Sequence, residues 1–275
     1  MNKLKVYSEK AQVNQITLHY LDTKSEGDTI ICLHGLWGRG ETWKSLMYKY
    51  GKDYRIIAPD LRGHGYSSKP NTPYTAKTMC DDIAGLMQHL SIDKAILIGH
   101  SQGGRIAGHL TYFHPTLVTK VAILDKSANG HDPSISINNE ITHKDPLTHN
   151  WPLPFESLED ARVFIRDEMD NPLSYDHFML SLTECENGYD MLFSQDAVGS
   201  LKANDTNWFH ILPKIKCPSL LMRTSSHEAV SNDDWEKMIS LLPNCTAVEM
   251  SHPDHNVHIA NPSEFYACLD TFIRG

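Results

Sequence analysis

One serine stands in a short glycine-flanked sequence that suits nucleophilic chemistry. The sequence Gly99-His100-Ser101-Gln102-Gly103 follows the apolar run 95–98 and precedes a helical pattern. Glycines at both ends let a strand turn sharply into a helix, so that the serine projects from the sheet edge beside the positive end of the helix. A serine at this place could instead do no more than cap the helix. The strand before it and the helix after it favour Ser101 as a nucleophile.

A serine hydroxyl is a weak nucleophile at neutral pH, so it needs an imidazole base that a carboxylate holds in place. Candidate bases are His252, His255 and His258, between an apolar run ending at Met250 and the expected closing helix. Their three-residue spacing could also suggest metal ligands. Pro253 disfavours a single helical face, and no cysteine or carboxylate cluster completes a ligand set. We therefore predict a catalytic base here, with no metal site and no cofactor.

A second glycine-containing loop follows the apolar run 29–33. It has the sequence His34-Gly35-Leu36-Trp37-Gly38. A loop that leaves the carboxyl end of a central strand can aim a backbone N–H group into the crevice where open α/β sheets bind ligands.

Together, H-G-x-x-G after one strand and G-x-S-x-G after a later one resemble the α/β-hydrolase family. This resemblance implies an oxyanion hole formed by the backbone N–H groups of Leu36 and Gln102. The family delivers its triad in the chain order serine, acid, histidine. The run D-H-N-V-H-x-x-N-P resembles the family's G-H-x-x-H-x-x-x-P run, whose first histidine is the base. The resemblance therefore implies His255 as the base, with His258 in a packing role.

The resemblance leaves two positions open for the acid. The family usually carries an aspartate a few residues after the strand expected at 220–222, and at the longer of two spacings Glu228 takes that position. Some members place the acid after the preceding strand, where Asp125 stands. We predict Glu228 with Asp125 as the alternative; Asp233 and Asp234 are further options.

Strand and helix patterns alternate along most of the chain, which predicts an α/β fold with a mostly parallel sheet and helices on both faces. The expected strands are 5–7, 16–21, 29–33, 56–58, 95–98, 118–124, 219–222 and 246–250, and the expected helices are 75–90, 103–114, 233–242 and 262–273.

The alternation stops after the sixth strand and resumes near residue 214. We therefore predict a core made of residues 1–126 and 214–275 and a helical cap made of 127–213 that covers the serine. Trp37, Trp151 and Trp208 are candidates for lining the substrate pocket.

Composition narrows the class of partner. The chain has 275 residues, 40% of them hydrophobic, and a net charge of −9, so it has no basic field to attract nucleic acid or anionic lipid. We expect a monomer or homodimer that acts on a small molecule, without a nucleic-acid or membrane partner. No apolar run approaches the roughly 18 residues of a membrane span, and the N-terminus has no apolar signal region, so we expect a cytoplasmic location.

These observations predict a serine hydrolase that cleaves an uncharged carboxylic ester or a related acyl bond through an acyl-enzyme. Two alternatives stay open. The same triad could hydrolyse a lactone or a carbon–carbon bond, and a receptor of the same fold could bind a ligand with little turnover.

Overall fold

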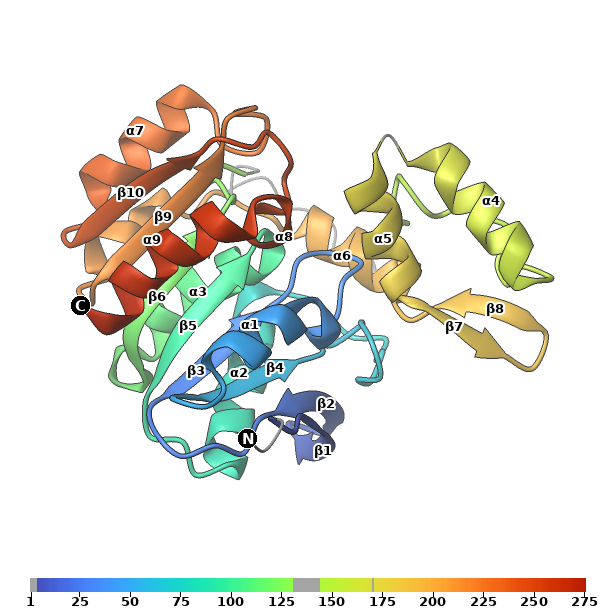
Figure 1. Cartoon of the computed structure of the whole chain (residues 1–275), viewed down its shortest axis with the longest axis horizontal. Coiled ribbons are helices and arrows are strands. Elements are labelled where there is room, and N and C mark those ends of the chain that lie inside the picture. The colour runs from blue at the N-terminus through green and yellow to red at the C-terminus, as the bar shows by residue number, and fades with distance from the viewer. Residues whose placement is uncertain (1–3, 131–143, 170) are drawn as a thin grey trace.

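A computed structural model describes residues 4–130, 144–169 and 171–275 of the chain. An eight-stranded sheet carries helices on both of its faces, and a smaller lobe stands to one side (Figure 1). The predicted mostly parallel α/β sheet is confirmed.

The sheet has the order β1-β2-β4-β3-β5-β6-β9-β10. The strand β2 pairs antiparallel with both β1 and β4, and the pairs from β4 through β10 are parallel. The strands are β1 (Tyr7–Val13), β2 (Ile16–Asp22), β3 (Thr29–Leu33), β4 (Arg55–Pro59), β5 (Ala95–His100), β6 (Val118–Leu124), β9 (Ser219–Thr224) and β10 (Cys245–Met250).

The first strand differs from its prediction. It begins at Tyr7 rather than ending there, and its register pairs Val13 with Ile16. Only two residues remain for the turn, and both Asn14 and Gln15 have positive φ, at 45° and 65°. A two-residue turn with positive φ at both positions matches the twist of a hairpin, so the strand extends up to the turn.

Helices cover the sheet in two layers. The longer ones are α1 (Lys44–Tyr50), α2 (Ala76–His89), α3 (Gln102–Phe113), α7 (Asn232–Leu241) and α9 (Pro262–Arg274). Helices α2, α3 and α7 pack into the core on one face, whereas α1 and α9 pack into the core on the other. Thr75 caps α2, since its side chain accepts the backbone N–H of Thr78.

The central strands are buried on both faces, which explains their continuous apolar runs. In β3, Ile31 and Leu33 join the core under α2 and α3, whereas Ile30 and Cys32 join the core under α1 and α9. Shorter helical turns connect these elements: η1 (Gly40–Trp43), η2 (Pro115–Leu117), η3 (Phe209–Lys214) and α8 (Val257–Ala260).

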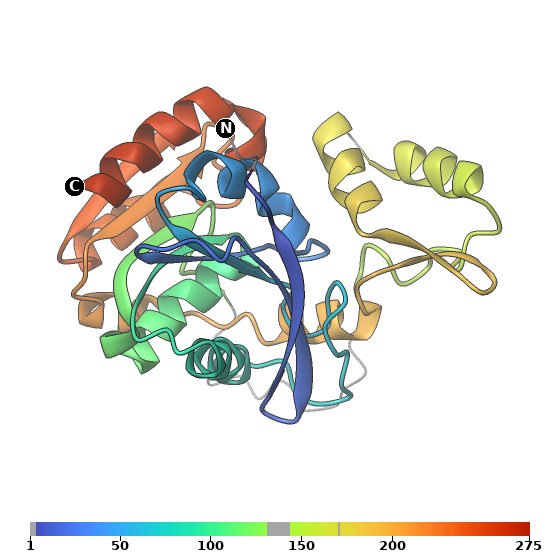
Figure 2. The ribbon, with the colours of Figure 1, turned by 60° about the horizontal axis from the view of Figure 1, so that its bottom comes forward.

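The lobe is built from the described residues between Asp145 and Ala203, within the segment that joins β6 to β9. It contains α4 (Leu158–Glu168), α5 (Pro172–Leu180), α6 (Gln195–Ala203) and the antiparallel hairpin of β7 (Leu182–Cys185) and β8 (Gly188–Met191). In both views α4, α5 and the hairpin stand apart from the sheet (Figure 1, Figure 2).

The lobe has a small core of its own, which includes Trp151, Phe155 and Phe178. Helix α6 joins the two parts, because Val198 packs into this lobe core while Leu201 packs into the main core. The prediction of a helical cap therefore missed the hairpin.

Candidate active site

Ser101 lies at a sharp bend between β5 and α3. Its backbone has φ 52° and ψ −119°, a conformation that L-residues rarely adopt. A Cβ atom on Gly99 would lie 2.2 Å from the carbonyl oxygen of Gly103, and one on Gly103 would lie 2.2 Å from that of Leu33. Only glycine fits at these two positions, so the G-x-S-x-G spacing is a steric requirement of the bend. The N–H of Ser101 donates to the carbonyl of Leu124 at 2.8 Å and fixes the bend to β6.

Asp125 directly follows β6, and its carboxylate is buried with a side-chain exposure of 1%. One oxygen accepts a hydrogen bond from Nδ1 of His255 at 2.7 Å, and the other accepts from the backbone N–H of Thr224 at 3.1 Å. Because a carboxylate only accepts, Nδ1 carries the proton of a neutral His255. Nε2 is then left without a proton and can act as a base.

Glu228, the acid that we predicted first, does not contact His255. It is exposed, and its backbone N–H donates to the hydroxyl of Ser226. The physical reason is the sheet order: β6 and β9 are neighbours and end at the same edge, which brings Asp125 beneath the imidazole. The turn after β9 carries Glu228 onward to the surface. Of the two further options named above, Asp234 accepts a hydrogen bond from Ser127 instead, and Asp233 is exposed in the first turn of α7.

The loop 251–256, which carries His255, is held against the bend at Ser101. Nε2 of His100 donates to the backbone carbonyl of His255 at 2.8 Å, and the two rings lie 4.7 Å apart between centroids. Burial lowers the pKa of His100 well below its ordinary value, so this donor stays neutral. The residue between Gly99 and Ser101 in the motif thus positions the loop that carries His255.

The other two late histidines occupy different environments. His258 is buried and stacks on Trp43 at 4.4 Å between ring centroids, and burial lowers its pKa to about 3. It fills the packing role that the resemblance implied. His252 is exposed, and its Nδ1 accepts the N–H of Asp254.

The two expected oxyanion donors are available. Gln102 is the first residue of α3, where a backbone N–H has no acceptor within its own helix. Within the described part of the chain, the N–H groups of Leu36 and Gln102 have no hydrogen-bond acceptor. Both are therefore free to bind an oxygen of a substrate.

A cavity of about 620 Å³ lies at Ser101 and Leu36. Its lining includes Leu36, Trp37, Ser101 and His255 from the main body and His177 from α5. The lobe thus forms one wall of the cavity that contains the serine and the imidazole. His177 was missed by sequence reasoning, because a lone histidine in a helical pattern carries no recognisable signal.

Trp37 lines this cavity as expected, but Trp151 and Trp208 do not. Trp151 packs in the lobe core with its ring 5.0 Å from that of Phe178. Trp208 is fully buried in the main core and lies so close to α3 that a Cβ on Gly108 would be 2.9 Å from its ring. Both side chains are buried in hydrophobic cores and do not reach the cavity. The prediction that Trp151 and Trp208 line the pocket is therefore wrong.

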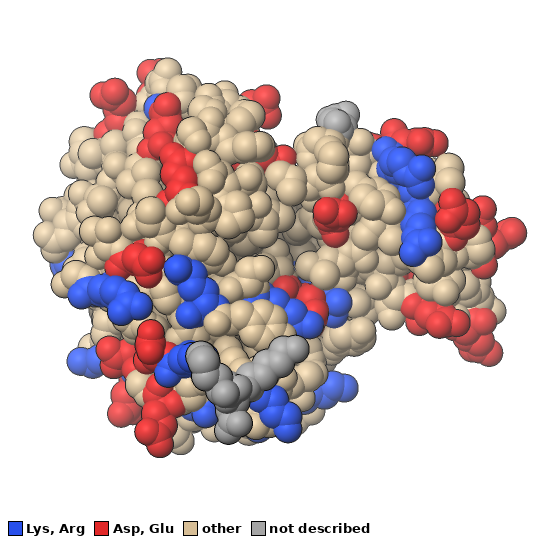
Figure 3. Space-filling view, viewed as in Figure 1, with Lys and Arg blue, Asp and Glu red and all other residues tan. Residues whose placement is uncertain are grey.

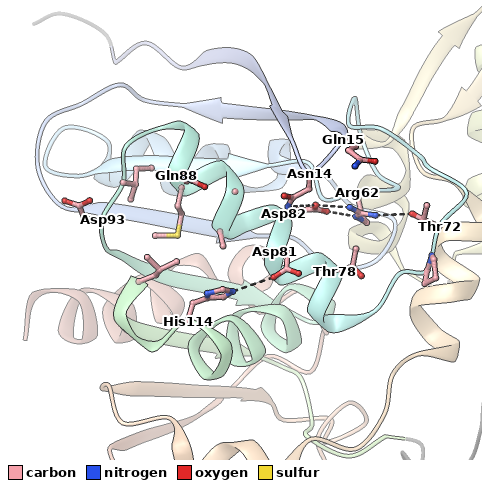
Figure 4. A pocket seen from close by; sticks show the side chains of 16 residues that line it. Asn14, Gln15, Arg62, Thr72, Thr78, Asp81, Asp82, Gln88, Asp93 and His114 are labelled. Carbon is pink, nitrogen blue, oxygen red and sulfur yellow. Dashed lines mark hydrogen bonds and ion pairs between the residues drawn. The ribbon is translucent and has the colours of Figure 1, made fainter.

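A larger cavity, of about 1000 Å³, lies beside α2 (Figure 4). None of the candidate catalytic residues lines it. Its buried ions already pair with each other, since Arg62 binds both carboxylate oxygens of Asp82, which also accepts from Asn14. The cavity at Ser101 is therefore the candidate active site.

The described residues contain no group of three or more histidine, cysteine, aspartate or glutamate side chains arranged to hold a metal ion. Over the same residues, no helix has both the length and the apolar character that crossing a bilayer requires.

Comparison with known proteins agrees with this geometry. Residues 28–151 match the family model of the alpha/beta hydrolase fold. The chain is 25% identical over 248 residues to a Haemophilus influenzae protein with an esterase/lipase name, covering 89% of this chain and 83% of that protein. It is also 25% identical over 268 residues to the sn-1-specific diacylglycerol lipase ABHD11 of Danio rerio, covering 94% and 82% of the two chains.

Among solved structures, E-2-(acetamidomethylene)succinate hydrolase superposes with a TM-score of 0.84 at 24% identity, covering 98% of this chain and 100% of that one. This likeness concerns the fold. The sheet order, the serine bend and these matches together show that the chain has the alpha/beta hydrolase fold.

Proposed function

We propose that this chain is a serine hydrolase that cleaves carboxylic esters or related acyl bonds through an acyl-enzyme. The observation that carries the proposal is the 2.7 Å hydrogen bond from His255 to the buried Asp125, together with the cavity that both His255 and Ser101 line. The relatives with esterase and lipase names support the same class of reaction.

The proposed reaction has two halves. The hydroxyl oxygen of Ser101 attacks the carbonyl carbon, and its proton passes to Nε2 of His255. The N–H groups of Leu36 and Gln102 bind the oxyanion, and each donor of this kind is worth roughly 10²–10³ in rate. When the intermediate collapses, the alcohol leaves with the proton from His255. Water then gives a proton to Nε2 of His255 and its oxygen attacks the acyl carbon. The bond from that carbon to the Ser101 oxygen breaks, the serine oxygen takes the proton back from His255, and the acid is released.

Asp125 has an electrostatic and orienting role in this scheme. Its negative charge stabilises the imidazolium that forms when His255 takes the proton. The second bond, from Thr224, fixes the rotation of the carboxylate, so the imidazole is held in one orientation.

The charges around the cavity favour a substrate without negative charge. Its described lining contains no lysine or arginine, and it includes the carboxylates of Glu228 and Asp254. Figure 3 shows the hollow between the main body and the lobe bordered mostly by uncharged side chains, with acidic ones at its upper rim and both acidic and basic ones below its lower end. A carboxylate on the substrate would meet repulsion there and no cationic partner. We therefore propose neutral esters as the substrate class.

The test combines turnover with covalent labelling. Incubation with p-nitrophenyl butyrate should give a burst of p-nitrophenol followed by steady release, and a fluorophosphonate should label the peptide that contains Ser101. Ser101→Ala should abolish both. His255→Ala should suppress turnover, whereas the matched change His252→Ala should leave most of it.

Absence of both labelling and turnover in the wild-type protein would refute the proposal. Labelling of Ser101 without steady release would instead favour a receptor of the same fold. Release from lactones or ring-cleavage diketones in preference to open-chain esters would favour the alternative hydrolase activities.

A further inference from the structure

We infer that His177 of the lobe is a positioning residue for the oxyanion hole, so that the lobe controls the catalytic competence of the loop at Leu36. This inference rests on the proposed function, because it concerns the same site.

The first contact is direct. Nε2 of His177 lies 3.0 Å from the backbone carbonyl oxygen of Leu36. A carbonyl only accepts, so Nε2 carries the proton and donates it. The residue whose N–H is expected to bind the oxyanion is therefore held, through its own carbonyl, by a side chain of α5.

Neighbouring residues of the same loop are held by the lobe as well. The carbonyl of Trp37 accepts a hydrogen bond from the hydroxyl of Ser181 at 2.6 Å. Nε of Arg39 donates to the carbonyl of Leu180 at 2.7 Å. The last turn of α5 and the residue after it therefore bind three of the four loop residues 36–39.

The loop needs such support because its backbone is strained. Trp37 has φ +60°, which is unfavourable for a bulky residue. Its indole N–H donates to Asp145 at 2.8 Å, a buried carboxylate that also pairs with Lys202. Strained backbone of this kind persists only where surrounding contacts fix it.

The ring of His177 also packs against the loop by shape. A Cβ atom on Gly38 would lie 2.9 Å from Cε1 of His177, so the glycine gives the ring its close approach. Position 38 is thus the point at which α5 and the loop meet. The last glycine of H-G-x-x-G, Gly38, therefore has a structural role as well: without a side chain of its own, it leaves room for the ring of His177, which binds Leu36.

Removing the donor should loosen Leu36 rather than remove its N–H. Displacements of about 1 Å at a catalytic group can cost about 10²-fold in rate, and complete loss of one oxyanion donor costs a similar factor. We expect His177→Phe, which keeps the ring but not the donor, to lower kcat by about 10- to 100-fold while KM changes less than about threefold.

The experiment compares three variants on p-nitrophenyl butyrate. His177→Gln can donate from its amide nitrogen, so it should recover most of the kcat lost in His177→Phe. Asp176→Asn is a matched control, since Asp176 is the adjacent exposed residue on α5. Inhibition by a trifluoromethyl ketone, whose adduct with Ser101 places an oxyanion in the hole, should weaken in His177→Phe in parallel with kcat.

A second measurement does not depend on activity. Hydrogen–deuterium exchange in peptides covering residues 35–42 should accelerate in His177→Phe, and stay near the wild-type rate in His177→Gln and Asp176→Asn. Unchanged exchange in a folded His177→Phe protein overturns the inference whatever the activity. So does a rise in KM with kcat unchanged, or a glutamine variant as impaired as the phenylalanine one. Failure of the proposed function would appear separately, as a wild-type protein without labelling or turnover.

Discussion

Replacing Asp125 by asparagine tests the assignment of the acid through the direction of one hydrogen bond. Asp125 accepts from the N–H of Thr224 on one oxygen and from His255 on the other. In Asp125→Asn the amide oxygen must face Thr224, because an amide NH₂ there would oppose another donor. The NH₂ group then faces Nδ1 of His255, which must become an acceptor. The ring proton moves to Nε2, where the base for Ser101 is required.

The expected cost follows from this wrong tautomer. A triad aspartate changed to asparagine costs about 10⁴ in kcat in enzymes with the same constellation, with geometry intact. Glu228→Gln, which alters an exposed side chain at the cavity edge, should reduce kcat by less than about tenfold.

The assay is the steady-state hydrolysis of p-nitrophenyl butyrate, with active sites counted by fluorophosphonate titration and folding checked by circular dichroism. A loss of more than about 10³ in Glu228→Gln, together with a loss under tenfold in Asp125→Asn, would refute the reasoning and restore the first prediction.

Further predictions concern steric fit, packing, substrate charge and pH. Gly103→Ala should lower the free energy of unfolding by at least about 2 kcal/mol in denaturant titration, because the new methyl would meet the carbonyl of Leu33 at 2.2 Å; unchanged stability would contradict the steric argument. Trp208→Phe should lower the free energy of unfolding by about 1–3 kcal/mol and leave kcat/KM within about twofold. A larger change in kcat/KM with an unchanged free energy of unfolding would instead support the first prediction, that Trp208 lines the substrate pocket. At low salt, kcat/KM for p-nitrophenyl hemiglutarate should be about tenfold or more below that for the neutral p-nitrophenyl valerate, and added salt should narrow the gap; equal values would argue against the acidic rim. Burial lowers the pKa of several histidines from an ordinary 6.5, so the unfolded chain binds more protons than the folded protein below that pH, and stability should be full above about pH 6.5 and fall by several kcal/mol toward pH 4. Among these histidines are His34 and His109, each with a pKa of about 4, and His64 and His258, each with a pKa of about 3. Urea titrations at several pH values would detect this, and a flat profile would contradict it.

The sequence predicts the serine bend well because the signals there are local. The steric conflicts that demand Gly99 and Gly103 arise within a few residues of the bend or with the adjacent strand. The apolar runs of the central strands are equally local, since burial on both faces leaves no polar position.

The acid is harder to predict because its position depends on which strand ends lie side by side. Asp125 and His255 are 130 residues apart in sequence, and the sheet order brings them together. Spacing within the segment after β9 favoured Glu228, and nothing in that segment records that the end of β6 lies beneath the imidazole.

The lobe was the least predictable part. Its hairpin turns at Glu186-Asn187, because Cys185 pairs with Gly188; Gly188 has φ +128° and sits against the carbonyl of Phe155. The Asn-Gly dipeptide at the end of this turn is a general turn signal that the sequence offers. The contacts of His177 with the Leu36 loop had no such signal, because they join segments about 140 residues apart.

The most direct test of the central claim is a crystal structure of the protein after reaction with a phosphonate ester. The account predicts a covalent bond from the Ser101 oxygen to phosphorus, with one phosphonyl oxygen within hydrogen-bond distance of the backbone nitrogens of both Leu36 and Gln102. Nε2 of His255 should face the bonded oxygen while Nδ1 keeps its contact with Asp125. An adduct on another residue, or an adduct on Ser101 whose oxygen points away from these two nitrogens, would contradict it.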